Sequence, residues 1–506
     1  NSGKLTMINA TIANNYGVAI DNKDSSCSIY GENVTIVNNK KLYSNDTKNS
    51  NGLVGNGYVY VTSILQDNDS VVDFTDIDSI KNQQLRLYSH AGTALAIDDK
   101  SIFSDFQFDY AQIFGTNYEL KDNGGYVETL ALSANSLAVA SDKKYFDNNQ
   151  KDYTYRLDLN DTGLKRQDSR GFMSNGYRDF GAYEYNGIVA FNSDTGVGYS
   201  TVTAAVGAAV SGQTIELANT RLNDRNIGGN IIIGAGKDII ISGQGDGAYL
   251  DMQSSYIRLN DNVTNSIFVR ITNITFANNN NESVIVNVNN NLLLDKVNFL
   301  NNNRAIDNIG GYVVVENSLF MNNGNANIDG GAIRVGNNGN LYVGSSSLYN
   351  NHAQNGGAIY FTGNGTIVLD GVTMGYNSAA GGRGGAVYVD SDSGILDIRN
   401  STIASNMAGI GSAVYAYSSI GELTFGISSS TIAYNVSTIE KGAVYNDNVR
   451  AYLLNTLITE NYFLDNGILV DHAPGDPSST EEYNIGGSYL GFNSIITTNY
   501  VYDEKT

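Results

Sequence analysis

The amino-acid sequence predicts an all-β protein, a right-handed parallel β-helix in which one coil takes roughly 21–29 residues. Three observations lead to this fold. A short strand-like pattern that closes on Asn recurs along the chain, a second pattern built on Gly-Gly-Ala alternates with it, and only one stretch has helical character. Paired-helix repeats need longer amphipathic stretches, so the period indicates stacked short strands.

The first pattern consists of alternating apolar residues, a small polar residue, a further apolar residue and, three positions later, an Asn. NITFANN, VNFLNN and NSLFMNN are clear copies. In coils stacked about 4.8 Å apart, equivalent side chains lie above one another. The closing Asn should therefore form a ladder in which each amide bonds the turn backbone and the Asn of the next coil. The predicted ladder is Asn279, Asn302, Asn323, Asn351, Asn377, Asn406, Asn435 and Asn461.

Apolar residues of the same copies are expected to face the core. Side chains of a strand alternate between the two faces of a sheet, so one set points inward in every coil. The predicted inward residues are Ile274, Phe276, Val297, Phe299, Leu319, Ile403 and Ile432.

The second pattern is GGA followed by Ile or Val, with weaker copies that begin at Gly411 and Lys441. Glycine supplies backbone conformations with positive φ, and it leaves room where the chain bends. We therefore assign these glycines to the turns of successive coils: Gly330, Gly331, Gly356, Gly357, Gly384 and Gly385.

The helical stretch, residues 199–210, is expected to cap one end of a β-helix, with Ser200 or Thr201 as its N-cap. Unpaired strand edges at the end of a solenoid need such a cover. Segments 213–217, 230–233 and 238–242 follow as the first predicted strands. The chain therefore divides into residues 1–187, the terminal coils of a preceding β-helix with an irregular closing segment, and residues 188–506, a second β-helix.

The beginning of the chain repeats a later part of it. Residues 2–15 align with residues 393–406, and residues 58–68 resemble residues 451–461. Residues 1–110 therefore look like a second copy of residues 392–506. The sequence contains no initiator Met, signal peptide or anchor, so we expect a processed chain or a segment of a longer one, with modules or copies that join end to end.

A Phe-x-x-Asn motif accompanies the GGA pattern, in the pairs Phe276 with Asn279, Phe299 with Asn302 and Phe320 with Asn323. The two motifs together resemble the repeats of chlamydial-type polymorphic membrane proteins and of adhesin-like surface proteins in other bacteria and in methanogenic archaea. The resemblance covers residues 260–465. It implies an extracellular right-handed β-helix with an adhesive role.

A second resemblance concerns the segment that precedes the helical stretch. Asn123-Gly-Gly, Asp168-Ser-Arg-Gly and Asp179-Phe-Gly-Ala-Tyr-Glu are similar to the segment that closes many bacterial surface β-helices. Leu137 stands where that segment usually has Pro, and Val139-Ala stands in place of Ile-Asp. The resemblance implies that a module ends near Glu184.

Composition limits the classes of partner. The formal net charge of −21 argues against nucleic acid and anionic membranes. No apolar run approaches the length of about 20 residues that a membrane-spanning helix needs. The single cysteine, Cys27, excludes an internal disulfide framework. With the resemblance above, these features favour an extracellular or cell-surface location.

Parallel β-helices also include enzymes that act on polysaccharides. Such chemistry needs carboxylates, often with Arg or Lys, clustered on one face of adjacent coils. The repeat positions carry Asn, Ser, Thr and Gly instead, so we assign no catalytic and no cofactor-binding residue. The acidic stretch with Asp67, Asp69 and Asp73 is a weak calcium candidate, because it lacks the Gly and the closing Glu of an EF-hand loop.

The expected function is structural and adhesive: stacked β-helix modules form a cell-surface fibre, stalk or filament. The expected partners are copies or modules of the same protein and, through avidity, glycans or cell surfaces. The first alternative is a polysaccharide-degrading enzyme or a phage tailspike, with its acidic cluster within residues 85–175 or 463–485. The second alternative is a subunit that assembles head to tail into a filament.

Overall fold

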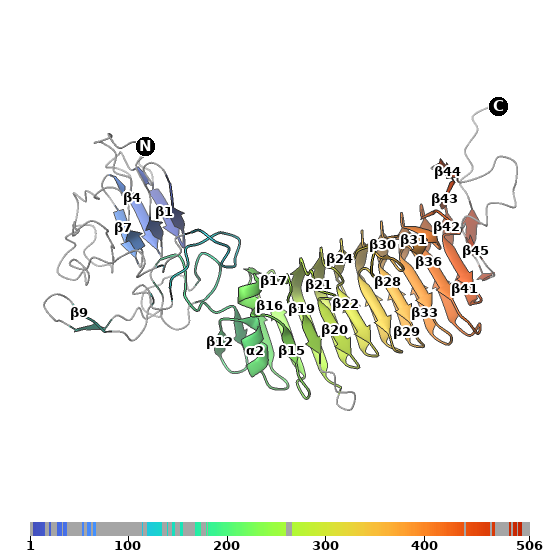
Figure 1. Ribbon diagram of the computed structural model, residues 1–506, viewed down its shortest axis with the longest axis horizontal. Coiled ribbons are helices and arrows are strands. Elements are labelled where there is room, and N and C mark those ends of the chain that lie inside the picture. The colour runs from blue at the N-terminus through green and yellow to red at the C-terminus, as the bar shows by residue number, and fades with distance from the viewer. Residues whose placement is uncertain are drawn as a thin grey trace. The chain divides into compact units, whose positions relative to one another are not determined.

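The computed structural model describes residues 4–15, 119–133, 181–259, 266–439 and 442–465, together with shorter segments of the first 180 residues and of residues 468–497. The chain divides into two compact units. One comprises residues 1–190, 198–201 and 220–226, and the other comprises residues 191–197, 202–219 and 227–506. Parallel strands form a β-solenoid of about 12 turns, and only about 4% of the chain is helical (Figure 1). The predicted all-β parallel solenoid is confirmed.

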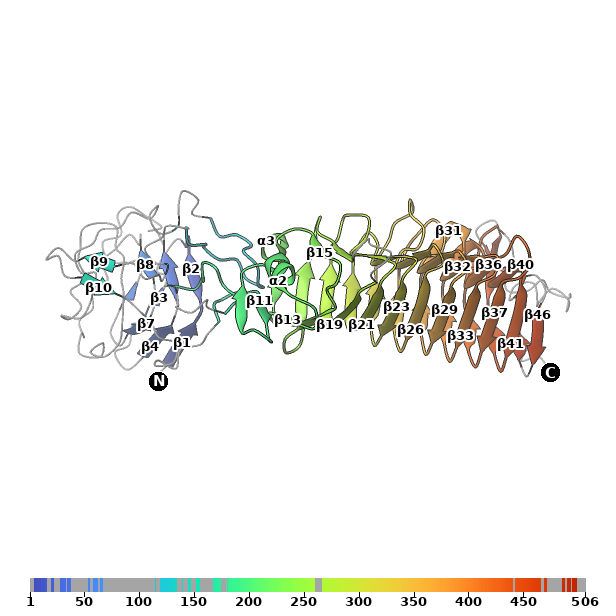
Figure 2. The same cartoon turned by 90° about the horizontal axis from the view of Figure 1, so that it is seen from below.

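In the second unit, every turn of the solenoid passes through the same series of strands. One strand lies in a ten-stranded parallel sheet, and the next one or two lie in a longer parallel sheet (Figures 1 and 2). A connection then returns the chain to the ten-stranded sheet one coil further on. The ten-stranded sheet contains β15 (Ile231–Ile233), β18 (Ile257–Leu259), β20 (Ile285–Val288), β22 (Ile306–Ile309), β25 (Ile333–Gly336), β28 (Ile359–Thr362), β32 (Val387–Asp390), β36 (Val414–Tyr417), β40 (Val444–Asp447) and β45 (Ile485–Gly486).

The longer sheet holds two rows of strands that meet at a corner. The first row contains β13 (Thr214–Leu217), β16 (Ile239–Gly243), β19 (Phe268–Ala277), β21 (Asn291–Leu300), β23 (Tyr312–Glu316), β26 (Asn340–Gly344), β29 (Thr366–Asp370), β33 (Ile395–Arg399), β37 (Thr424–Ser428), β41 (Arg450–Leu454) and β46 (Tyr489–Phe492). The second row contains β17 (Ala248–Asp251), β24 (Leu319–Met321), β27 (Ser347–Tyr349), β30 (Thr373–Gly375), β34 (Thr402–Ala404), β38 (Thr431–Ala433), β42 (Leu457–Thr459) and β47 (Ile495–Thr497). β19 and β21 are long enough to span both rows.

A third sheet forms within the connections of the last coils. It contains β31 (Ser378–Arg383), β35 (Met407–Ile410), β39 (Val436–Ser437), β43 (Tyr462–Asp465) and β44 (Ile468–Val470). β31, β35, β39 and β43 pair in parallel, whereas β44 folds back antiparallel on β43.

The core consists of apolar side chains stacked in register from coil to coil. Phe276, Phe299 and Phe320 are fully buried, and their ring centroids are 5.3 and 4.8 Å apart. Six of the seven predicted inward residues are buried, but Leu319 is half-buried and was assigned to the wrong face. The register pairs Leu319 with Asn298 and pairs Phe320 with Phe299, so Phe320 is the inward residue.

A helix covers part of the solenoid at the start of the second unit, as the sequence predicted. α2 (Val202–Ala208) is shorter than the predicted 199–210, and Thr201 precedes its first residue. Val202, Ala205 and Val206 form its buried face, which packs on β15 and β13. A second short helix, α3 (Asp224–Ile227), was not predicted.

The first unit also contains parallel strand pairs. β1 (Lys4–Ile8), β4 (Ser28–Glu32) and β7 (Tyr58–Val61) form one parallel sheet, and β2 (Thr11–Ala13), β5 (Thr35–Val37) and β8 (Ile64–Gln66) form another. β1 and β2 begin 391 residues before β33 and β34, which is the offset of the sequence alignment. Two further pairs are β3 (Ile20–Asp21) with β6 (Leu53–Val54), and the antiparallel β9 (Lys144–Phe146) with β10 (Asp152–Thr154).

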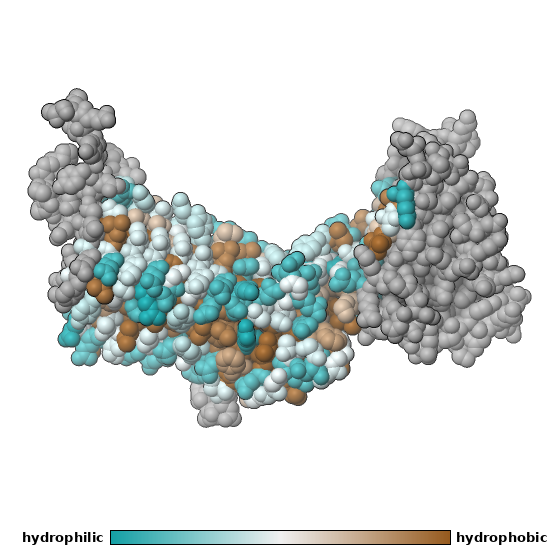
Figure 3. All heavy atoms as spheres, turned by 180° about the vertical axis from the view of Figure 1, so that it is seen from behind, coloured by the Kyte–Doolittle hydropathy of each residue, from teal (hydrophilic) through white to brown (hydrophobic). Residues whose placement is uncertain are grey.

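The surface of the solenoid mixes polar and apolar side chains. On the face seen in Figure 3, hydrophobic residues are interspersed with hydrophilic ones. Among the described residues, no helix has both the length and the apolar character needed to cross a membrane.

Candidate functional site

The predicted Asn residues lie in one buried line along the solenoid. The eight side chains are at most 3% exposed. Each Asn from Asn279 to Asn435 donates its backbone N–H to the Oδ1 of the ladder Asn in the next coil, over 2.8–3.1 Å. From Asn302 onward, the Nδ2 group also donates to that Oδ1 and to a backbone carbonyl in the preceding coil. The ladder therefore joins successive coils through side chains as well as through the sheets.

The residue before each ladder Asn takes the left-handed backbone conformation. Asn278, Asn301, Asn322 and Asn350 do so with φ between 53° and 58°. Asn tolerates this region better than most residues, which explains why the first copies of the pattern end in Asn-Asn. In later coils the same position holds Tyr376, Ser405, Tyr434 and Glu460, with φ between 52° and 61°.

A line of hydroxyl groups, not predicted from the sequence, lies at the corner between the two rows of the longer sheet. The backbone N–H of Val297 donates to Ser318 Oγ, and the N–H of Ser318 donates to Ser346 Oγ. Ser401 and Ser430 repeat this arrangement in later coils. Its sequence signal is the small polar residue of the first pattern, to which the sequence-based prediction assigned no role.

The glycine pairs lie where the connections enter the ten-stranded sheet. Gly330, Gly356 and Gly384 have φ of 69°, 59° and 67°, in the left-handed region. The second glycine of each pair has another constraint: a Cβ on Gly331, Gly357 or Gly385 would clash with the carbonyl oxygen of the following coil. Both glycines are therefore required by the backbone, the first for its conformation and the second for the close approach of neighbouring coils.

The calcium candidates Asp67, Asp69 and Asp73 lie outside the described residues. Within the described part of the chain, no group of three or more His, Cys, Asp or Glu side chains is arranged to hold a metal ion. Most of residues 85–175 and 463–485, where the enzyme alternative would require an acidic cluster, is also outside the described ranges. Asp122 and Asp168, which are described there, pair with Arg221 and Arg170.

The structure brings the three parts of the closing segment together around Arg170. Its guanidinium bonds Asp168 Oδ2 (2.8 Å from Nε), the carbonyl of Glu184 (2.6 Å) and the carbonyl of Asn123 (3.2 Å). The side chains of Arg170 and Asp168 are 3% and 1% exposed. The guanidinium also lies 3.7 Å from the ring centroid of Tyr183, so cation–π contact adds to the hydrogen bonds. This buried network fastens segments that are far apart in the sequence.

A column of four tyrosines, the tyrosine column, follows the GGA pattern on the outer face of the ten-stranded sheet: Tyr360, Tyr388, Tyr415 and Tyr445. Their rings are stacked nearly parallel at 5.0, 5.5 and 5.6 Å. Burial raises the pKa of Tyr388 to about 12, and burial also raises the pKa of Tyr415. The sequence signal is the Tyr that follows GGAI, GGAV and the weaker copies GSAV and KGAV, and this column was not predicted.

Charged side chains precede the tyrosine column on the same face. Asp307 Oδ2 lies 3.3 Å from Arg334 Nη1, and its Oδ1 has no hydrogen-bond partner among the described residues. Burial raises the pKa of Asp307 and lowers the pKa of Arg304. Arg304 donates to Ser283 Oγ and to the carbonyls of Asp329 and Gly330. This charged group thus joins coils through hydrogen bonds.

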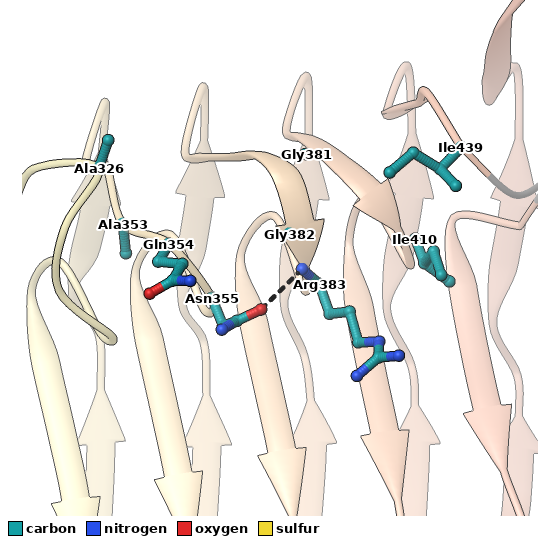
Figure 4. A pocket seen from close by; sticks show the side chains of 9 residues that line it. All are labelled: Ala326, Ala353, Gln354, Asn355, Gly381, Gly382, Arg383, Ile410 and Ile439. Carbon is teal, nitrogen blue, oxygen red and sulfur yellow. Dashed lines mark hydrogen bonds between the residues drawn. The ribbon is translucent and has the colours of Figure 1, made fainter.

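A recess of about 480 Å³, the Arg383 recess, opens beside the tyrosine column. It is lined by residues of five successive connections: Ala326, then Ala353 to Asn355, then Gly381 to Arg383, then Ile410 and finally Ile439 (Figure 4). The backbone N–H of Arg383 donates to Asn355 Oδ1 over 3.1 Å. The Arg383 guanidinium lies 5.2 Å from the ring centroid of Tyr415. Residues with guanidinium, amide and aliphatic side chains therefore line one hollow.

Comparisons with protein-family models, with curated proteins and with solved structures found no match for this chain. The geometry defines the structural class of the protein. It is a parallel β-solenoid whose coils are connected by internal ladders of side chains.

Proposed function

We propose that this chain is a stiff structural segment of an extracellular fibre or stalk, of the adhesin-like type that its repeats resemble. The observation that carries the proposal is the Asn ladder, in which eight buried amides connect successive coils. Bending the solenoid would lengthen these hydrogen bonds together with those of the sheets. Cross-links of this kind are best suited to a rod that has to resist bending.

Two other observations support this proposal. The hydroxyl groups at the strand corners and the stacked phenylalanine rings repeat along the same axis, so each coil is held to the next at several points. The 391-residue offset between β1–β2 and β33–β34 supports a succession of similar modules. The stability of such a protein is approximately the sum of the stability of each coil and of the contacts between neighbouring coils. Modules can therefore be added without changing the fold.

The test is antibody labelling of intact source cells, combined with the denatured mass of the labelled polypeptide. Label on the cell exterior and a mass far above 54.3 kDa would support a module of a long fibre. Exterior label with a mass near 54.3 kDa would instead favour subunits that associate end to end, which electron microscopy of the purified protein would show as filaments. Label confined to the cell interior would contradict both forms of the proposal.

A further inference from the structure

We propose that the Arg383 recess binds a carboxylate-bearing saccharide, with the sugar chain lying along the solenoid axis. This inference goes beyond the structural role proposed above, since it assigns a ligand site to the side of the rod.

The cation of the site makes a side-chain hydrogen bond with Tyr388, and the remaining donors of its guanidinium are available for a ligand. Arg383 is exposed, and within the described part of the chain its guanidinium forms no ion pair with a carboxylate. Arg334 and Arg399, on the outer faces of the same solenoid, are both paired with Asp side chains. The guanidinium offers a planar fork of donors that matches a carboxylate in a bidentate way. Its place near the Tyr415 ring limits the directions in which it can point.

The rest of the lining suits a sugar ring. Ile410 and the 61% exposed Ile439 present aliphatic surface, which can pack on the C–H face of a pyranose. Gln354 is exposed and brings an amide, which can donate to and accept from ring hydroxyls. A simple inorganic anion would use the guanidinium but not the aliphatic wall.

The backbone is shaped to keep this hollow open. The pairing of β31 with β35 slips between Ala379 and Arg383: Ala379 pairs with Ala408, but Arg383 pairs with Ile410. The extra residues include Gly381, with φ of 82° and nothing within 4 Å of a Cβ placed on it. At Gly382 a Cβ would clash with the carbonyl oxygen of Gln354. Bulges commonly redirect a side chain. Here the bulge carries Arg383 to the recess, Gly381 borders open space, and Gly382 allows the close approach of the Gln354 carbonyl.

The recess is elongated along the axis of the solenoid. Its lining comes from five successive coils, which at about 4.8 Å per coil span about 19 Å. One coil step is close to the length of one residue in an extended sugar chain, so a short oligosaccharide can place equivalent groups on successive coils. Its volume of about 480 Å³ lies within the usual range of small-ligand sites. Because the net charge of −21 repels anions in general, binding of an acidic sugar should depend on Arg383 itself.

The experiment is calorimetric titration of the whole chain with 1,4-linked tetrasaccharides of glucuronate, galacturonate and mannuronate, each beside its neutral counterpart. We expect at least one uronate to bind about tenfold or more tightly than its neutral counterpart, since a hydrogen bond to a charged group contributes about 1.5–3 kcal/mol. Arg383→Gln should remove this preference. Ala326→Phe, at the exposed end of the recess, should weaken binding of the same sugar by blocking the hollow.

Arg399→Gln is the matched control, because Arg399 lies on β33 and pairs with Asp370 outside the recess. It should bind the uronate as the unchanged protein does, and melting curves should show that all variants are folded. The proposal is overturned if no uronate binds in the millimolar range, if neutral and acidic sugars bind equally, or if the Arg383 and Arg399 variants behave alike. None of these outcomes bears on the rod function, which depends on the ladders and the cellular location.

Discussion

Replacement of Asn377 by Ala should destabilise the coils around it by about 4 kcal/mol. Asn377 is fully buried at an internal position of the Asn ladder. Its Nδ2 donates to the carbonyl of Leu348 and to Asn406 Oδ1, both over 2.9 Å. Its Oδ1 accepts the backbone N–H and the Nδ2 of Asn351, over 3.0 and 2.9 Å. Four hydrogen bonds at about 1 kcal/mol each give the estimate, and a buried donor left without a partner costs about 1–3 kcal/mol, so the loss can be larger.

The assay is hydrogen exchange of peptides from residues 348–406, read by mass spectrometry beside chemical denaturation of the whole chain. Stability in a solenoid depends on each coil and its neighbours, so exchange should accelerate in these peptides more than in those of distant coils. Asn291→Ala is the control, because Asn291 is an exposed Asn at the start of β21. It should change stability by less than about 0.5 kcal/mol. The reasoning is refuted if the two variants exchange alike between residues 348 and 406.

Three further substitutions test other parts of the structure. Ser405→Asn should raise the free energy of unfolding by about 0.5–1 kcal/mol, because Asn tolerates the left-handed φ of 61° better than Ser does; a lower denaturation midpoint would contradict this. Arg170→Ala should lower the free energy of unfolding by about 3–5 kcal/mol, because it leaves the buried Asp168 carboxylate without its cation. Limited proteolysis between residues 123 and 184 should then be faster than in the unchanged protein. An unchanged rate would contradict this prediction. Burial raises the pKa of Tyr388 from 10.0 to about 12, so its contribution to stability is complete below pH 10 and is lost as the pH rises toward 12. Tyr388→Phe should reduce the fall in melting temperature between pH about 8 and about 11; an equal fall in both proteins would show that other groups cause it.

The solenoid could be predicted because stacking turns a sequence period into a structural one. In a parallel stack, equivalent residues of successive coils contact one another, so Asn279, Asn302 and their successors must share one environment. The same reasoning gave a wrong assignment at Leu319, which is half-buried, whereas its neighbour Phe320 is fully buried. A left-handed residue at each corner restarts the alternation, so the inward side chain has to be counted back from the ladder Asn, which selects Phe320 opposite Phe299.

The fold class, the length of a coil and the glycines at its turns could be predicted from the residues alone, because each of these is a local pattern repeated many times. Two groupings are visible only in the folded chain: Arg170 with Asn123, Asp168 and Glu184, and the residues that line the Arg383 recess. The first grouping joins segments of the chain that are not copies of one repeat. The second depends on a bulge in β31 and on residues contributed by five successive coils. Neither has a repeated sequence signal, since each occurs once and arises from contacts between residues that are distant along the chain.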